Sequence, residues 1–160
     1  MKPKISKHIS YNEATHSYTA KRYGIDNTPN DDVLKNMRHT AHCIFEPLRA
    51  HFGEPIKINS FYRSKKLNRK IGGTARSQHI TGEAMDLDDT YGRLFRNKNY
   101  FDYIRKNLDF DQLIWEFGDD NNPDWVHVSC RANINRNRHQ VLRSFRRNGK
   151  TIYQEWQPRL

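Results

Sequence analysis

The chain has 160 residues, of which 35% are hydrophobic and 12% aromatic. This length suits one domain, expected to span residues 1–160, and the composition excludes disorder throughout. The 28 Lys and Arg residues against 18 Asp and Glu give a formal net charge of +10, which favours anionic surroundings such as nucleic acid, anionic lipid or bacterial envelope polymers. No apolar run reaches transmembrane length, and the first residues lack the apolar stretch of a secretory signal, so we expect synthesis in a cytoplasm.

The first half of the chain is expected to be mainly helical. Residues 10–13 (Ser-Tyr-Asn-Glu) have the spacing of a capping box, which predicts a helix from there towards Gly24. Apolar residues at three- and four-residue intervals predict a longer helix from Asn30. Pro47 is expected to kink this helix and Gly53 to end it.

Strands dominate the second half. Alternating or short apolar runs predict strands over residues 56–60, 84–87, 112–117 and 125–129. Short helices are expected over residues 64–71 and 97–107. Asn148-Gly149, between residues 139–147 and 151–156, predicts a β-hairpin. Because helices come first and strands later, without βαβ alternation, the sequence predicts an α+β fold with a small, mainly antiparallel sheet.

The positions of the two cysteines in the sequence do not by themselves indicate a function. They are too few for a disulfide framework. Cys43 falls within the long helical pattern and is expected to be a small core residue. Neither Cys43 nor Cys130 has the C-x-x-C spacing that is typical of a redox or structural zinc site.

Three residues have the character of metal ligands: His79, Asp86 and His127. Two histidines and an aspartate suit Zn²⁺ and leave a fourth position open, as catalytic zinc sites do. A loop that carries His79 and turns at Gly82 into a strand can bring Asp86 to the same point. In the strand over residues 125–129, alternation places His127 on the face opposite the two valines. The sequence therefore predicts a zinc site in which His127 faces a cleft.

Three charged residues are candidates for the chemistry beside this metal. Asp124, three residues before His127, can accept a proton from the attacking water and pass it to a leaving amine; the alternative is a turn residue in a polar loop. Glu116 competes for this role, since it also lies close in sequence to His127. Arg63 follows a predicted strand and is either a solvated side chain or a clamp for a carboxylate or tetrahedral oxyanion.

These residues form recognisable motifs. The pattern Ser77-x-His79-x-x-Gly82-x-Ala84-x-Asp86 with Trp125-x-His127 resembles the zinc D-alanyl-D-alanine carboxypeptidases, which include VanX- and VanY-type dipeptidases and phage L-alanyl-D-glutamate endolysins. The likeness is to the short, phage-type branch and covers about residues 5–156. Its other motifs occur in order and unbroken: EPLR at 46–49, S-x-Y-R-S at 60–64, LN-x-x-I-GG at 67–73 and DQLIWE at 111–116.

The resemblance implies a fold and a set of roles. The fold is of the Hedgehog/DD-peptidase type, in which helices pack on one side of a small antiparallel sheet and zinc lies in a groove. His79, Asp86 and His127 would bind one zinc per chain, Asp124 would be the acid/base, and Arg63 would stabilise the substrate and the intermediate. Substrate contacts are expected from Ser77, Gln78 and Trp125, with capping of the loop as the alternative for Ser77.

The resemblance also implies a substrate. The expected reaction is hydrolysis of peptide bonds in bacterial peptidoglycan stems, as a carboxypeptidase or an endopeptidase, by a monomeric enzyme. Without a secretory signal, a phage endolysin that a holin releases to the cell wall fits best.

Two other functions remain open. The chain could be a non-catalytic, zinc-containing module of the same fold that binds the cell wall, although Asp124 and Arg63 would then be unnecessary. Residues 131–150 contain six arginines, one lysine and no acidic residue. This segment could bind anionic envelope polymers, aid solubility or bind nucleic acid, but no zinc-finger or other nucleic-acid motif accompanies it.

Overall fold

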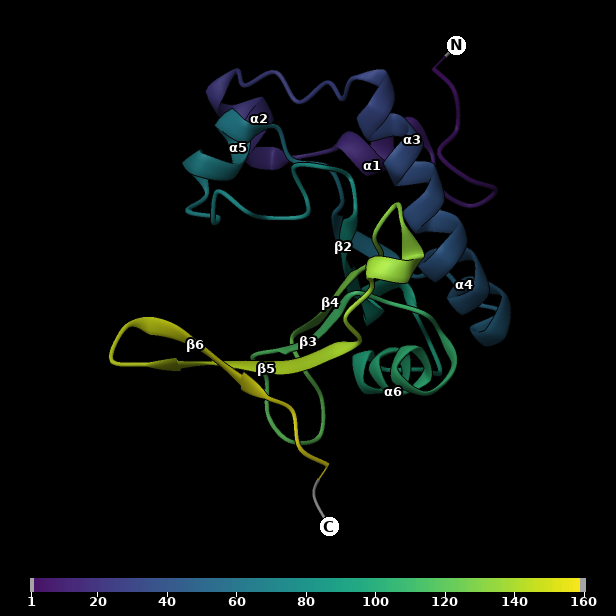
Figure 1. Ribbon diagram of the computed structural model, residues 1–160, viewed down its shortest axis with the longest axis vertical. Helices are drawn as coiled ribbons and strands as arrows, with labels where there is room; N and C mark the ends of the chain where they lie inside the picture. The colour runs from purple at the N-terminus through teal and green to yellow at the C-terminus, as the bar shows by residue number, and fades with distance from the viewer. Residues whose placement is uncertain (1, 159–160) are drawn as a thin grey trace.

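A six-stranded sheet forms the centre of the computed structural model, which describes residues 2–158 (Figure 1). Its strand order is β1-β2-β4-β3-β5-β6, and every neighbouring pair is antiparallel except β3 and β5. The predicted α+β class with a mainly antiparallel sheet is thus confirmed. The strands are β1 Lys57–Ser60, β2 Ala84–Asp88, β3 Gln112–Glu116, β4 Trp125–Ser129, β5 Gln140–Arg147 and β6 Lys150–Glu155.

Six α-helices accompany the sheet within the described residues. They are α1 Tyr11–Thr15, α2 Tyr18–Tyr23, α3 Asp31–Thr40, α4 Glu46–Phe52, α5 Lys65–Lys70 and α6 Asn97–Asn107. A π-helical turn, Ala41–Phe45, joins α3 to α4, and two 3₁₀ turns cover Asp89–Tyr91 and Ile134–Arg136. Across residues 2–158, no helix combines the length and apolarity needed to cross a bilayer.

The helix predicted from residue 10 to Gly24 is in fact two helices, so that prediction was wrong. Ser10 caps α1 by accepting from the Glu13 N–H, but the backbone becomes extended at His16. Ser17 then caps α2 through the Ala20 N–H. Because the Ser17 side chain can accept from the free N–H groups of a helix start, it favours a new helix there over continuation of the first one.

The long second helix is interrupted by a wider turn. Its start at residue 30 and its end at Gly53, with φ of 68°, agree with the prediction. Just before Pro47 the backbone forms the π turn, where the Glu46 N–H bonds to the Ala41 carbonyl. Pro47 has no N–H, and its ring crowds the carbonyl of Cys43. The kink predicted at Pro47 therefore takes the form of a π turn.

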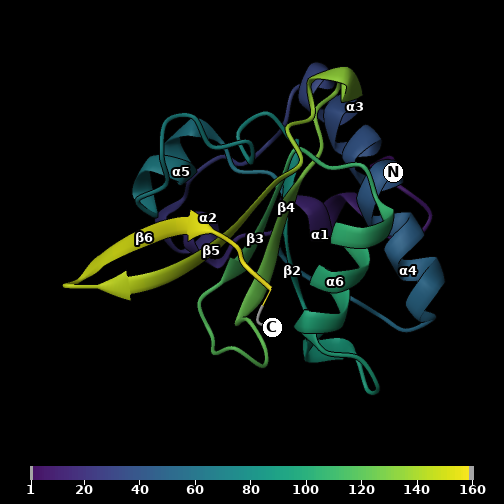
Figure 2. The same ribbon diagram turned by 60° about the horizontal axis from the view of Figure 1, so that its bottom comes forward.

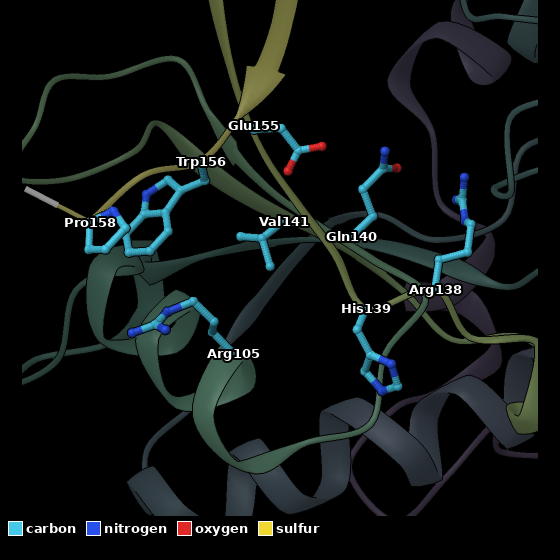
Figure 3. Close-up of a pocket in the computed structure, with 8 residues that line it drawn as sticks. All are labelled: Arg105, Arg138, His139, Gln140, Val141, Glu155, Trp156 and Pro158. Atoms are coloured by element: carbon cyan, nitrogen blue, oxygen red, sulfur yellow. The ribbon is translucent and has the colours of Figure 1, made fainter.

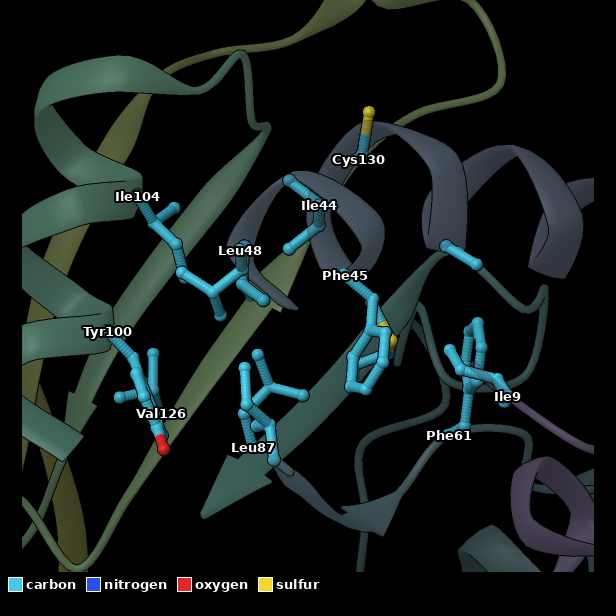
Figure 4. Close-up of a cluster of buried hydrophobic side chains, with 14 of the residues drawn as sticks. Ile9, Ile44, Phe45, Leu48, Phe61, Leu87, Tyr100, Ile104, Val126 and Cys130 are labelled. Carbon is cyan, nitrogen blue, oxygen red and sulfur yellow. The ribbon is translucent and has the colours of Figure 1, made fainter. Parts of the chain in front are cut away.

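The main core lies on one face of the sheet. Val126 and Val128 of β4 are fully buried there, and Figure 2 shows α3, α4 and α6 on this side. Figure 4 shows side chains of the sheet pointing toward those of the helices. The labelled residues of this cluster include Ile44, Leu48, Leu87, Tyr100, Ile104 and Val126. A small separate cluster, Ala20, Ile25 and Leu67, joins α2 to α5.

The other face of the sheet carries polar side chains. Asp86 is the direct partner of His127 across β2 and β4. Ile114 is the partner of His127 across β3 and β4, so Glu116, two residues further along β3, lies on the same face as His127. The predicted hairpin of β5 and β6 extends from the sheet edge (Figure 1), and positive φ at Asn148 and Gly149 confirms its turn.

Candidate metal centre

His79, Asp86 and His127 bring their donor atoms to within 4.8 Å of one another. His79 Nε2 lies 3.3 Å and His127 Nδ1 3.0 Å from the same oxygen, Asp86 Oδ1. Nitrogen and oxygen ligands of one tetrahedral Zn²⁺ are about 3.4 Å apart, given metal–ligand distances near 2.1 Å. The spacing of these three donors therefore fits zinc.

The surroundings of His79 fix which ring nitrogen is available. Its Nδ1 lies 2.7 Å from the carbonyl oxygen of Phe61, and a ring nitrogen at that distance must donate a proton. Nε2 then presents its lone pair to Asp86, as a metal ligand requires. Burial lowers the pKa of His79, which keeps the ring in the neutral form that binds metal.

Asp86 uses its two oxygens for different partners. Oδ1 faces the two histidines, and Oδ2 accepts a hydrogen bond of 2.8 Å from Arg63 Nη2. Burial by itself would raise the pKa of Asp86, but the neighbouring histidines outweigh it and hold the pKa below its usual range. Arg63 Nε also donates to Ser60 Oγ at 2.8 Å. Arg63 therefore orients Asp86, a candidate metal ligand, and its predicted role toward an oxyanion remains a prediction.

Gly82 shapes the loop that presents His79. Its φ of +75° lies in the left-handed region, and a Cβ there would approach Met37 Cγ to 2.6 Å and the Val33 carbonyl oxygen to 2.9 Å. Thr40 Oγ1 also donates to the Gly82 carbonyl at 3.1 Å. The loop is thus packed directly against α3, and only glycine fits without displacement.

Glu116 is the carboxylate that the sheet places beside the metal centre. It is buried, and its side chain accepts a hydrogen bond from the Ser144 hydroxyl. Burial raises its pKa, and the charges of His127, Asp86 and Arg63 all act on it. Ser144 could not be predicted from local sequence, because it lies far along the chain and meets Glu116 only through the parallel pairing of β3 with β5.

Asp124 lies at the entrance to β4. Its side chain is exposed, while its backbone N–H donates to the Glu116 carbonyl at 2.9 Å and its carbonyl accepts from Asn97 Nδ2 at 3.0 Å. Within residues 2–158, its carboxylate makes no hydrogen bond or ion pair. Its predicted acid/base role remains a prediction.

The three residues expected to contact substrate have partners within the protein. Ser77 Oγ accepts from the His79 N–H at 3.4 Å, in keeping with loop capping. Gln78 donates to Asp111 at 3.0 Å. Trp125 lies on the same strand face as His127 and packs against Phe117, with ring centroids 5.3 Å apart. Their contact with substrate stays a prediction.

Two hollows differ in their relation to this centre. A cleft of about 630 Å³ includes Ser60 and Arg63 in its wall and extends past Lys57, Tyr62 and Tyr91. The hollow in Figure 3 lies elsewhere, where Arg105, Val141 and Trp156 surround it. Neither hollow is lined by His79, Asp86 or His127, but the first is lined by Arg63, whose guanidinium contacts Asp86. The first cleft is therefore the candidate substrate channel.

Comparison with known proteins agrees with this site. No curated protein matches the chain. The family described as Peptidase M15 matches residues 7–129, a range that includes all three metal-site residues, Arg63 and Glu116 but ends before β5. The members of this family are zinc-dependent metallopeptidases. Because the match covers more than half of the sequence, the chain belongs to the peptidase M15 family.

Proposed function

We propose that this protein is a zinc-dependent peptidase that hydrolyses peptide bonds in bacterial peptidoglycan stem peptides. The observation that carries the proposal is the convergence of His79, Asp86 and His127 on the polar face of the sheet, at ligand spacing. Zinc held there would polarise the scissile carbonyl and make water a better nucleophile at neutral pH. The family match supports a peptidase, and the resemblance to enzymes acting on peptidoglycan supports stem peptides as its substrate class.

The proton transfer needs a carboxylate, and the geometry favours Glu116 for it. Glu116 shares the sheet face of His127 and Asp86 and is buried among site charges. Burial strengthens such a group as a proton carrier, because its pKa moves toward neutral pH. Asp124, favoured by the resemblance, is exposed at the start of β4. Both residues therefore enter the tests below.

Arg63 and the adjoining cleft suit a substrate that carries carboxylates. Two of the five guanidinium N–H groups are used by Asp86 and Ser60, so others remain for a substrate carboxylate or a developing oxyanion. Lys57 adds a second positive charge to the wall of the cleft. Stem peptides contain free carboxylates, which fits this lining.

The basic segment 131–150 supports only part of the proposed attraction to anionic envelope polymers. Arg131 and Arg138 both pair with buried Asp111, and Arg143 pairs with Asp120. The exposed charges of Arg147 and Lys150 lie at the tip of the β5–β6 hairpin. We infer that binding of anionic polymers by this segment involves its exposed cations, Arg136 and those at this tip, rather than the whole segment.

The test is digestion of purified peptidoglycan by the zinc-loaded chain, followed by mass spectrometry of the soluble muropeptides. Release of terminal D-alanine would indicate a carboxypeptidase, and new L-alanine or cross-bridge ends an endopeptidase; the latter would fit a phage-type endolysin acting on the wall after holin release. Chelation should stop the reaction. A folded, zinc-loaded chain that sediments with peptidoglycan without cutting it would favour the non-catalytic binding module.

A further inference from the structure

A second group of metal-binding side chains lies outside the site described above. His39 comes from α3, Cys43 from the π turn, and Cys130 from the residue directly after β4. His39 Nε2 lies 3.4 Å from Cys43 Sγ and 3.9 Å from Cys130 Sγ. All three donor atoms lie within 4.8 Å of one another.

These distances match a tetrahedral thiolate–imidazole site. With Zn–S near 2.3 Å and Zn–N near 2.05 Å, the sulfur and nitrogen ligands of one zinc lie about 3.6 Å apart. The two measured distances lie on either side of that value. Two cysteines and one histidine are also a ligand set that zinc and other soft divalent cations prefer.

The cluster is separate from the metal centre of the peptidase. Alternation along β4 places Cys130 on the core side of the sheet, with Val126 and Val128, whereas His127 faces the other side. Figure 4 shows the sulfur of Cys130 pointing away from the labelled apolar side chains. Cys130 is buried, but His39 and Cys43 are partly exposed, so an ion can reach the cluster from solvent.

The local backbone holds the first two donors together. His39 and Cys43 are four residues apart on one helical face, at the π turn, a feature that is common at functional sites. His39 Nε2 also lies 3.0 Å from the Arg131 carbonyl oxygen. Without metal, Nε2–H donates to that oxygen; with metal on Nε2, the neutral ring carries its proton on Nδ1 instead, and the protons of the two thiols are released to solvent.

We propose that His39, Cys43 and Cys130 form a second metal site, which takes Zn²⁺ or another soft divalent cation and ties the α3–π segment to the end of β4. This site would raise the content from the one zinc expected at His79, Asp86 and His127 to two per chain. Its role is structural, because it lies on the far side of the sheet from the peptidase centre and fixes the end of the strand that carries His127.

Cobalt titration of the reduced, metal-free full chain separates the two sites. Thiolate ligands give Co²⁺ an intense charge-transfer absorption in the near ultraviolet, whereas the nitrogen and oxygen donors of the first site cannot. We expect two bound Co²⁺ per chain, one of which produces this band. Cys43→Ser and His39→Gln should each lose the band and keep one bound Co²⁺, while His42→Gln, an exposed neighbour on the same turn, should keep both.

A second measurement does not depend on variants that fold. Zn²⁺ should protect Cys43 and Cys130 of the unmodified chain from alkylation, read by mass spectrometry under a thiol-free reductant. One bound Co²⁺ without a thiolate band, a band that persists in Cys43→Ser, or equal alkylation with and without Zn²⁺ would each overturn the proposal. So would a Cys43–Cys130 disulfide that persists in the metal-loaded chain, which would make the pair a redox element.

Discussion

Asp86 and His127 are direct partners across the β2–β4 ladder, and His127 Nδ1 lies 3.0 Å from Asp86 Oδ1. Backbone hydrogen bonds of the ladder, rather than a metal, bring these two side chains together. Two of the three proposed zinc ligands are therefore preorganised by the sheet, and removal of one side chain should leave the strands paired.

The first prediction concerns His127. We expect His127→Ala to lose zinc and to reduce peptidase activity by more than about 100-fold. Removal of a residue that only hydrogen-bonds to a metal ligand costs up to about 100-fold, and removal of a ligand itself should cost more. Metal analysis, circular dichroism and a peptidoglycan assay check this outcome. His139→Ala, which removes an exposed histidine from a surface pair with Asp109, should leave both metal and activity intact. Full zinc retention by His127→Ala would contradict the ligand set.

The second prediction separates the two carboxylates. Glu116→Gln keeps the size of the side chain and its contact with Ser144 but cannot accept the proton. We expect it to bind zinc normally and to lose about 10²–10⁴-fold in kcat, the usual contribution of a general acid or base. Asp124→Asn should retain most of its activity. The opposite pattern in steady-state kinetics would assign the proton transfer to Asp124.

The third prediction concerns the guanidinium of Arg63. Arg63→Lys keeps the positive charge but cannot bond to Asp86 and Ser60 simultaneously in the same planar geometry. We expect a fall of about 10–100-fold in kcat/KM with little change in folding. A matched Lys65→Arg variant, at an exposed position on α5, should behave as the unmodified chain. Unchanged kinetics for Arg63→Lys would mean that charge alone is needed there.

The fourth prediction concerns the loop that carries His79. Gly72→Ala should lower the free energy of unfolding by about 1 kcal/mol, the cost of an alanine at positive φ. No steric cost is added, because a Cβ there meets nothing within 4 Å. Gly82→Ala should cost about 2 kcal/mol more, since its Cβ collides with Met37 and Val33, and should weaken zinc binding as the loop moves. Denaturant unfolding and zinc affinity measure the two effects. Equal destabilisation of the two variants would show that Met37 and Val33 of α3 move away from the added Cβ at little energetic cost.

The fifth prediction concerns the buried carboxylate of Asp111. Its burial would raise its pKa, but hydrogen bonds from Arg138 and Arg131 outweigh this and hold the pKa below the usual range. Because the pKa of Asp111 is lower in the folded chain than in the unfolded chain, the ionised carboxylate stabilises the fold. This stabilisation is complete above the ordinary aspartate pKa of about 4 and is lost as the pH falls below it.

Asp111→Asn should therefore lower the free energy of unfolding by about 3 kcal/mol at neutral pH, since two arginines lose their charged partner. The difference from the unmodified chain should shrink in acid. Asp102→Asn, which breaks only the exposed pair with Lys98, should cost about 0.5 kcal/mol or less. A pH-independent difference for Asp111→Asn would refute the electrostatic explanation.

Local patterns in the sequence were enough for most elements. Helical apolar spacing, strand alternation and the Asn-Gly turn signal each depend on neighbours within a few residues, so α6, β4 and the Asn148-Gly149 hairpin could be predicted. The split between α1 and α2 was missed because Ser17 competes with helix continuation, and residue spacing does not show which of the two prevails.

By itself the sequence was enough to propose His79, Asp86 and His127 as metal ligands and to predict the face of β4 on which His127 lies, because both follow from residue chemistry and a two-residue repeat. Only the tertiary structure decided which groups meet across long separations. The pairing of β3 with β4 places Glu116 on the face of the candidate metal site, and the packing of the π turn against the end of β4 brings Cys43 to Cys130. Such contacts depend on strand register and helix packing between distant segments, and no local spacing in the chain encodes them.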